Sequence, residues 1–387
     1  MRQTEIARPP RYIWERPEWP HFRWNAEAVL SSVGEARHRQ GILDGALREA
    51  GFNECRDVFG RAVTEEAIET SEIEGEKLDP EAVRSSVARR LGLPEGGLGP
   101  EDARADGVVA MTLDATQQFA HPLTVDRLHR WHAELFPLER GENARIPIAR
   151  WRDDSNGPMQ VVSGPVHRRR VHFEAPRAQR VPDEVDRFLS WFNAKNGLDG
   201  LIRTAYAHLW FVTIHPYADG NGRIGRAIAD MALAQDEVAS ARFISMSRQI
   251  RRDKARYYDM LEQTQLGDLD ITLWLEWFLA CYARAAEHAL VILGEVLRAA
   301  RFWRHHQDIA FNARQKKVLG RFLHEFEGKL TAKKWATIAK TSLDTAQRDI
   351  AELLARDVLL KNPGGSKNTS YSILPSADVS VGEERRR

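Results

Sequence analysis

Hydrophobic positions along most of this chain recur every three to four residues, which is the spacing of an amphipathic α-helix. The pattern predicts helices at about 25–50, 58–74, 80–91, 102–120, 125–136, 183–196, 201–214 and 270–301. Short apolar runs typical of strands occur at 161–165 and 170–173, where they predict two strands about a turn. The fold class expected from the pattern is therefore mainly α, with one small β-hairpin.

Local signals mark where several of these helices begin. Asp79 followed by Pro80 is typical of a helix start, with Asp as the N-cap and Pro in the first turn. Thr124 is expected to cap the helix at 125–136, and Asp270 the helix at 270–301. Residues 92–101 are rich in Gly and Pro and predict a linker.

Composition describes an ordinary globular chain. Its 387 residues are enough for two or three domains, and 43% are hydrophobic while 29% are charged. The formal net charge of +1 argues against a surface that coats nucleic acid uniformly. With only Cys55 and Cys281, neither a disulfide framework nor a cysteine zinc site is expected.

No membrane segment is expected either. The start of the chain lacks the apolar run of a signal peptide. The most apolar stretch, 271–297, is interrupted by charged residues such as Glu276 and Arg284, which predicts a packed helix rather than a membrane span. The expected location is the cytoplasm.

The stretch from His215 to Arg226 concentrates chemistry within a dozen positions. It reads His-Pro-Tyr-Ala-Asp-Gly-Asn-Gly-Arg-Ile-Gly-Arg. His215 is a candidate base and Asp219 a ligand for a hard cation, while the glycines let backbone N–H groups approach a phosphate closely. Arg223 and Arg226 lie at i and i+3 on one face of the helix that follows. Together these residues suit a polyphosphate with a metal, beside a group that can take a proton.

Two other interpretations of this stretch were considered. Its glycines also satisfy a dinucleotide-binding fingerprint, but that fingerprint needs a preceding strand, and 201–214 has helical periodicity instead. A purely structural turn with solvated arginines is the second alternative. The ordered combination of His, Asp and Arg favours a functional site.

This stretch resembles the signature of the Fic family, His-x-Phe-x-Asp/Glu-Gly-Asn-Gly-Arg-x-x-Arg, with Tyr217 in place of the usual Phe, at a position expected to be packed. The resemblance implies a Fic/Fido helical bundle in which the hairpin near 161–173 is a flap that aligns the target by strand addition. It also implies transfer of AMP from ATP to a Ser, Thr or Tyr hydroxyl of a protein target, including this protein itself.

The same resemblance assigns roles to single residues. His215 would take the proton of the attacking hydroxyl, and Asp219 would hold Mg²⁺ on the phosphates of ATP. The implied phosphate contacts are Gly220, Asn221, Gly222, Arg223 and, for the γ-phosphate, Arg226. Tyr257 or Tyr258 could stack on adenine, and a core tyrosine is the alternative at either position.

Residues 70–75, Thr-Ser-Glu-Ile-Glu-Gly, resemble the inhibitory motif of the same family, in the subclass whose inhibitory helix precedes the catalytic core. The resemblance implies that Glu74 pairs with Arg226 in place of the γ-phosphate and so misplaces ATP. The alternative is that Glu74 belongs to a solvated acidic helix end. The presence of the second motif favours inhibition.

The N-terminal segment is also informative. Residues 9–24, rich in Pro and Trp, are expected to pin their aromatic rings onto the following helices, and they resemble a small domain often fused to bacterial Fic proteins. His129 and His132 lie near each other on one helix, but no third metal ligand is suggested, so helix-surface or core histidines are favoured.

The C-terminal region resembles a winged helix-turn-helix domain. Thr331 and residue Ser342 are expected to begin its second and third helices, and a two-strand wing is expected around Gly364-Gly365. A basic bias permits contact with DNA through 305–375, and contact with protein is the equal alternative.

The expected domains are an N-terminal helical domain at 1–100 with an inhibitory helix at about 58–75, a Fic core at 101–304, the winged helix at 305–375, and a disordered tail at 376–387.

Alternative functions remain open at this point. The protein could remove AMP, transfer a group from another phosphate donor, or act as a DNA-binding regulator with an ATP-sensing core. A homodimer is neither indicated nor excluded.

Overall fold

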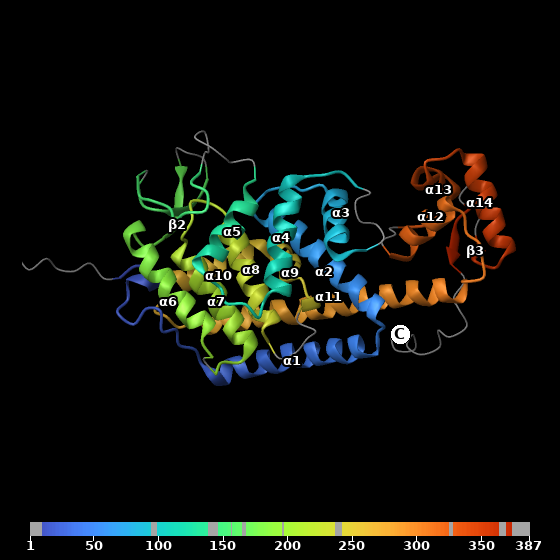
Figure 1. Ribbon diagram of the computed structural model, residues 1–387. Coiled ribbons are helices and arrows are strands. Elements are labelled where there is room, and N and C mark those ends of the chain that lie inside the picture. Colours follow the sequence, from blue (N-terminus) through green and yellow to red (C-terminus); the bar gives the residue numbers. More distant parts are fainter. Residues whose placement is uncertain are drawn as a thin grey trace, which may run out of the picture. The chain divides into compact units, whose positions relative to one another are not determined.

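The computed structural model describes residues 10–93, 99–137, 146–155, 157–164, 168–195, 197–236, 242–324, 328–363 and 369–373. The chain forms two compact units, one made of Met1–Glu49 with Arg56–Leu290 and the other of Ala50–Cys55 with Val291–Arg387. Both are mostly helical, as the periodicity predicts (Figure 1). Within the described ranges, no helix is long and apolar enough to cross a membrane.

The helices up to the end of the first unit follow the predicted order. They are α1 (Ala26–Glu49), α2 (Phe52–Ile73), α3 (Pro80–Leu91), α4 (Ala103–Gln117), α5 (Val125–Leu135), α6 (Val181–Asn193), α7 (Gly200–Ile214), α8 (Asn221–Ala234), α9 (Met246–Arg252), α10 (Lys254–Gln265) and α11 (Thr272–His305), with short 3₁₀ turns η1 (Ile13–Glu15) and η3 (Ala178–Arg180). Two caps are confirmed: Asp79 accepts from the Glu81 N–H, and Thr124 from the Arg127 N–H. Asp270 lies two residues before the start of α11 and accepts from the Thr272 N–H at 2.9 Å.

Two features of this order differ from the prediction. Helix α2 begins at Phe52, six residues before the expected start at 58, because its first turns carry polar residues that give no periodic signal. Helix α9 was not predicted at all. Its seven residues span fewer than two turns of periodic pattern, and its start depends on Ser245, whose side chain accepts from the Arg248 N–H.

The centre of the first unit is the pair α7–α8, which lie side by side (Figure 1). From Thr204 to Ile214 every residue of α7 is buried, as expected for a helix that is apolar on all sides. Gly225 of α8 permits the close approach, because an added Cβ would lie 2.8 Å from the Cγ1 of Val212. This packing fixes the loop between the two helices, residues 215–220.

The predicted hairpin is present. Strands β1 (Gln160–Ser163) and β2 (Arg170–Glu174) pair antiparallel, with Val161 opposite Phe173 and an irregularity after Val161. Pro165, in the predicted turn, lies outside the described residues.

The N-terminal aromatics are pinned to the unit, as predicted. The indole N–H of Trp14 donates to the Glu174 carbonyl at 2.7 Å, and that of Trp19 donates to the Glu184 carboxylate at 2.9 Å. A packing role for this segment is therefore confirmed.

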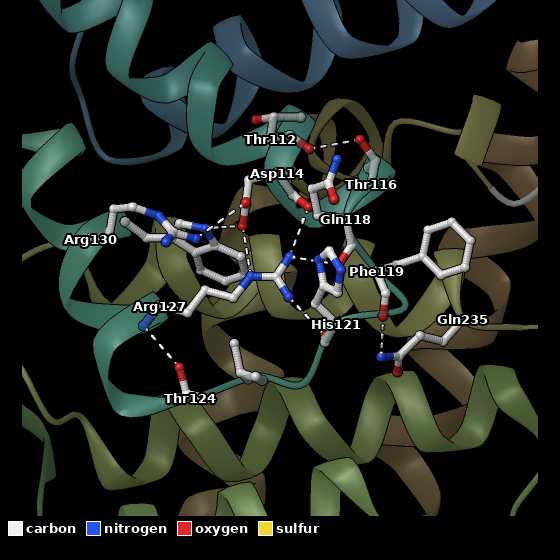
Figure 2. A network of polar contacts seen from close by, with 12 residues as sticks. Thr112, Asp114, Thr116, Gln118, Phe119, His121, Thr124, Arg127, Arg130 and Gln235 are labelled. Carbon is white, nitrogen blue, oxygen red and sulfur yellow. Dashed lines mark hydrogen bonds and ion pairs between the residues drawn. The ribbon is translucent and has the colours of Figure 1, made fainter.

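Helices α4 and α5 are joined through one buried arginine (Figure 2). Arg127 donates to the Asp114 carboxylate and to the backbone carbonyls of Asp114, Gln118 and His121, at 2.7 to 3.1 Å. These carbonyls belong to the last turn of α4 and the loop after it, and those of Asp114 and Gln118 also accept from backbone N–H groups. The network therefore fixes α5, whose other face packs against the loop between α7 and α8.

In its described residues, the second unit contains three further helices and two strands. They are α12 (Ala313–His324), α13 (Ala332–Ala339), α14 (Leu343–Ala355), β3 (Leu359–Lys361) and β4 (Tyr371–Ile373), and the strands pair antiparallel. Thr331 and Ser342 cap α13 and α14 as predicted, and Trp335 and Ile350 are part of the unit's core.

The element order of this unit is the one predicted for a winged helix, and that assignment stays a prediction. So do the domain boundaries at 100, 304 and 375. The wing turn at Gly364-Gly365 and the tail at 376–387 lie outside the described residues.

Candidate functional site

His215 ends α7 in a left-handed conformation, with φ of 52°. Its Nδ1 lies 3.2 Å from the Val212 carbonyl oxygen. Because a carbonyl only accepts, Nδ1 carries the proton of that bond, and Nε2 is left as the acceptor. Burial lowers the pKa of His215 to about 4, although the Glu74 and Asp219 carboxylates act in the opposite direction. The imidazole is therefore neutral near pH 7 and can accept a proton at Nε2.

The loop after His215 is closed by Asn221. The Asn221 side chain accepts from the Tyr217 N–H at 2.9 Å and donates to the Tyr217 carbonyl at 2.8 Å. Gly220 precedes α8 with φ of 83°, and an added Cβ would lie 3.0 Å from the Phe136 ring. The amide of Asn221 is thus occupied by the loop itself, and its predicted contact with a phosphate stays a prediction.

An aromatic cluster lies beneath this loop. Tyr217 is fully buried, as predicted for this position, and stacks on His132 with ring centroids 4.2 Å apart. His129 Nδ1 lies 3.0 Å from the Tyr217 hydroxyl, and Trp151 packs against the same ring. Burial lowers the pKa of His132 to about 4. The two histidines are therefore packing residues of the loop, as favoured by the sequence.

Arg226 lies on the inner face of α8 and is 2% exposed. Its Nε donates to the Thr70 hydroxyl at 2.7 Å, and its Nη2 donates to the Thr70 carbonyl at 3.0 Å and to Glu74 Oε1 at 2.8 Å. Among the described residues, its Nη1 is buried without a hydrogen-bond partner. A buried N–H that lacks a partner is costly, so this guanidinium is suited to one more anionic oxygen.

Arg223 lies one turn earlier on the same helix and is 5% exposed. Its Nη1 donates to Glu76 Oε2 at 2.7 Å, and its guanidinium carbon lies 4.9 Å from the centre of the Phe136 ring. Its Nε is buried and has no hydrogen-bond partner in the part of the chain that the structure describes. Both motif arginines are therefore paired with carboxylates. Each also has one buried N–H group without a partner among the described residues.

Glu74 lies against the first turn of α8. A Cβ added to Gly222 would be 2.1 Å from Glu74 Oε1, so only glycine leaves room for this carboxylate. Burial alone would raise the pKa of Glu74, but Arg226 and, less strongly, Arg223 and His215 lower it below its ordinary value. The carboxylate therefore remains ionised beside the positive end of the helix, which is a favourable position for an anion.

Asp219 is the exposed acidic residue of the loop, and its Oδ1 accepts from the Gly220 N–H at 2.6 Å. In the described part of the chain, no group of three or more His, Cys, Asp or Glu side chains is arranged to hold a metal. The donor set therefore fits a hard cation such as Mg²⁺ that takes one carboxylate from the protein and its other oxygens from phosphate and water.

The two tyrosines predicted near adenine differ in environment. Tyr257 is 2% exposed, and its hydroxyl bonds to His208 Nε2 at 2.9 Å, so it is a core residue. Tyr258 is 38% exposed, with the Lys254 ammonium 5.9 Å from its ring centre. Of the two tyrosines, Tyr258 has the exposed ring, and its stacking on adenine remains a prediction.

The sequence analysis gave no role to three further residues of the site. Thr70 and Glu76 bond to the two arginines, and Arg152 donates to the His215 carbonyl at 2.7 Å. Thr70 is the first residue of the inhibitory motif, so its position could have suggested the contact. Glu76 and Arg152 could be found only from the fold.

The fold and this loop define a class of protein, and comparison with known proteins gives the same class. Residues 122–233 match the Fic/DOC family, and residues 12–93 match a domain of unknown function, DUF4172. The chain therefore carries a Fic/DOC domain. The matched range contains His215 and Arg226, and DUF4172 contains Glu74 and Glu76.

The chain is also similar to a curated protein and to a solved structure. It is similar, at 25% identity over 95 residues, to an Aquifex aeolicus protein named "Probable protein adenylyltransferase", covering 24% of this chain and 27% of that protein. It thus spans about a quarter of that relative's length.

The crystal structure of a Fic family protein from Desulfovibrio desulfuricans G20 matches with a TM-score of 0.51 and 19% identity, covering 91% of this chain and 97% of that one. At this identity the match establishes the fold. The predicted fold class, a mainly α Fic-type bundle, is confirmed.

Proposed function

We propose that this protein is a protein adenylyltransferase that transfers AMP from ATP to a Ser, Thr or Tyr hydroxyl of a protein target, and that Glu74 inhibits it. The observation that carries the proposal is the position of Glu74 itself. An anionic oxygen already lies on the first turn of α8 and accepts from the buried Arg226. A phosphate oxygen of ATP has the same charge and hydrogen-bonding needs.

The phosphates of ATP would lie along the start of α8. Gly220 and Gly222 let the backbone approach them closely, and the first N–H groups of the helix have no intrahelical acceptor. Arg223 and Arg226 would bind the outer phosphates through the guanidinium nitrogens that now hold Glu76 and Glu74, together with Nε and Nη1, which have no partner among the described residues. The name of the Aquifex aeolicus relative supports AMP as the transferred group.

His215 would act as the base. Its lowered pKa leaves the ring neutral near pH 7, and because Nδ1 carries the proton donated to the Val212 carbonyl, Nε2 is unprotonated. The target hydroxyl would give its proton to Nε2 while its oxygen forms a bond to the α-phosphorus. The bond between that phosphorus and the β-phosphate oxygen would break, and pyrophosphate would leave.

Asp219 would hold Mg²⁺ against the phosphates. When bound, the ion would offset negative charge on the phosphate oxygens. The exposure of Asp219 and its place between His215 and Gly220 suit this role.

Glu74 would inhibit by competition for Arg226. While the carboxylate holds Nη2 of this arginine, a γ-phosphate cannot bind there, and ATP would bind with its α-phosphorus misplaced. A coupling of about 1.4 kcal/mol already reduces productive binding tenfold.

The proposal is tested by intact mass after incubation with Mg-ATP. We expect Glu74→Gly to gain one adenylyl unit, or to add one to a protein substrate, and the double variant Glu74→Gly/His215→Ala to gain none. A labelled double variant would exclude His215 as the base. Transfer of a different group would identify another donor, and loss of AMP from a labelled target would identify the reverse reaction; either result would contradict the proposal.

A further inference from the structure

The turn that ends α2 presents two carboxylates to the two motif arginines. Glu74 Oε1 lies 2.8 Å from Arg226 Nη2, and Glu76 Oε2 lies 2.7 Å from Arg223 Nη1. The motif that predicted Glu74 ends at Gly75, so Glu76 has no part in it. The two arginines are three residues apart on one helix face, and the two carboxylates are two residues apart on one turn.

The backbone of this turn explains why both side chains point to α8. The Glu76 N–H donates to the Ser71 carbonyl and the Gly75 N–H to the Glu72 carbonyl, with Gly75 at φ of 83°. This is a Schellman ending, in which the residue between the two carboxylates must adopt a left-handed conformation. No atom lies within 4 Å of a Cβ added to Gly75, so its backbone angle, and not space, requires glycine.

Glu76 is well placed to hold Arg223. Its second oxygen lies 3.6 Å from Arg104 Nη1, so the carboxylate is shared between two cations. The Arg223 side chain is 5% exposed while that of Glu76 is 24% exposed. A neutralised and buried arginine attracts phosphate less than a free one, because part of its hydrogen-bonding capacity and its charge are already compensated.

We propose that Glu76 is the second carboxylate of an inhibitory lock, in which Glu74 and Glu76 together neutralise Arg226 and Arg223 and compete with the phosphates of ATP. This inference rests on the proposed nucleotide site. It predicts that removing Glu74 alone leaves the protein partly inhibited, because Glu76 still holds Arg223.

The lock opens at the turn and not by departure of α2. The body of α2 is fixed to α9 by Glu66, which is 4% exposed and accepts from the Ser245 hydroxyl, the Ser247 hydroxyl and the Ser247 N–H. Glu76 is held by side-chain contacts alone, apart from the backbone bond of the Schellman ending. A phosphate can therefore displace the two carboxylates while the helix stays in place.

The experiment compares Glu74→Gly, Glu76→Gln, Glu76→Asp, the double variant Glu74→Gly/Glu76→Gln and a control, Glu72→Gln. Glu72 is the matched control because it is also an α2 carboxylate paired with an arginine. Its partner is Arg251 of α9, which is neither of the two motif arginines. The rate of adenylyl incorporation by intact mass and the Kd for Mg-ATP by calorimetry are measured on the full chain, and circular dichroism shows that each variant is folded.

We expect Glu76→Gln to tighten Mg-ATP binding and to raise the rate by about threefold to tenfold, the effect of one partly exposed charge pair. The double variant should exceed Glu74→Gly. Glu76→Asp should resemble Glu76→Gln, because the shorter side chain keeps its charge but cannot reach Arg223.

The proposal is overturned if Glu74→Gly raises the rate while Glu76→Gln matches the Glu72→Gln control or lowers the rate. A lowered rate would make Glu76 a residue that positions Arg223 for catalysis. If no variant, including Glu74→Gly, gains an adenylyl unit, the proposed function fails instead, and the two failures are thereby distinguished.

Discussion

Two groups of acidic side chains follow one another along α2 and the turn after it, and they bind different partners. The first group anchors the helix to α9 and α11 through Arg248, Arg251, His288 and the two serines at the start of α9. The second group, Glu74 and Glu76, binds the two arginines of α8. Both are sets of ion pairs, and a count of salt bridges would not separate them.

The difference lies in what would be exposed if each carboxylate were removed. Without the first group, partly exposed arginines and the capped start of α9 would return to water or to other partners. Without the second group, two nearly buried guanidinium groups would remain on the first turns of α8 without their carboxylates. A carboxylate at such a place is expected to act as a competitor of an anionic ligand. Under the proposed function, the acidic end of α2 would be structural in one half and regulatory in the other.

The largest effect of a substitution on AMP transfer is expected at His215. His215→Ala should lower AMP transfer by about 10²–10⁴-fold, the usual contribution of a general base. ATP binding should persist, because the arginines are unchanged. His288→Ala, which removes a histidine of the anchoring group, is the control and should leave transfer nearly unchanged. Rates of AMP transfer are measured for both variants in a Glu74→Gly background. An equal loss of rate in His215→Ala and His288→Ala would contradict a special role for His215.

The free energy of unfolding should depend on pH in different ranges through the buried histidines and through Glu74. Burial lowers the pKa of His132, His208 and His215 to about 4. Between about pH 6.5 and 4 these three groups bind more protons in the unfolded chain than in the folded one, so their contribution to stability is full above pH 6.5 and falls as the pH falls. The three histidines together contribute a slope of about 4 kcal/mol per pH unit, and Asp230, whose pKa burial raises, acts in the opposite direction.

Urea unfolding at pH 7.5, 6 and 5 measures this slope. Glu74, whose pKa is lowered, keeps its contribution over the same range and loses it only as the pH falls through its own folded pKa. His208→Asn should reduce the slope by about one third. A midpoint that does not change between pH 7.5 and 5 would show that these histidines titrate normally in the folded protein.

The anchoring group should affect stability and not inhibition. Glu66→Ala should lower the free energy of unfolding by about 2–3 kcal/mol, because it leaves two buried serine hydroxyls and an N–H without a charged acceptor. Labelling per folded molecule should not rise. Thermal or urea unfolding, followed by a labelling assay well below the midpoint, tests both points. A strong activation by Glu66→Ala would mean that α2 as a whole must leave for ATP to bind.

A smaller free-energy change is expected for the lock itself. Glu74→Gly should raise self-labelling by more than tenfold, about 1.4 kcal/mol, because the fork of Arg226 becomes available to phosphate. The free energy of unfolding should change much less than in Glu66→Ala. An unchanged labelling rate would place Glu74 with the anchoring carboxylates and remove the contrast between the two halves of the helix.

Much of the fold could be read in advance, because helices and caps depend on near neighbours. The periodic spacing predicted most helix ranges, and Asp79, Thr124 and Ser342 cap the helices that they were expected to begin. The short helix α9 was missed because seven residues carry too little periodicity. The packed position of Tyr217 was also predicted, but its bond to His129 depends on how α5 lies against the loop.

For this protein, the sequence alone determined which residue types follow one another at the start of α8, and so the presence of a base, an acidic ligand and two arginines in one loop. It did not determine which donors remain available. Asn221 turns its amide into the loop, and Tyr257 is buried against His208. Only the tertiary structure decided that Glu76 meets Arg223, 147 residues further along the chain. The physical reason is that caps and periodicity are local, whereas the partner of a buried charge is chosen by how distant helices pack.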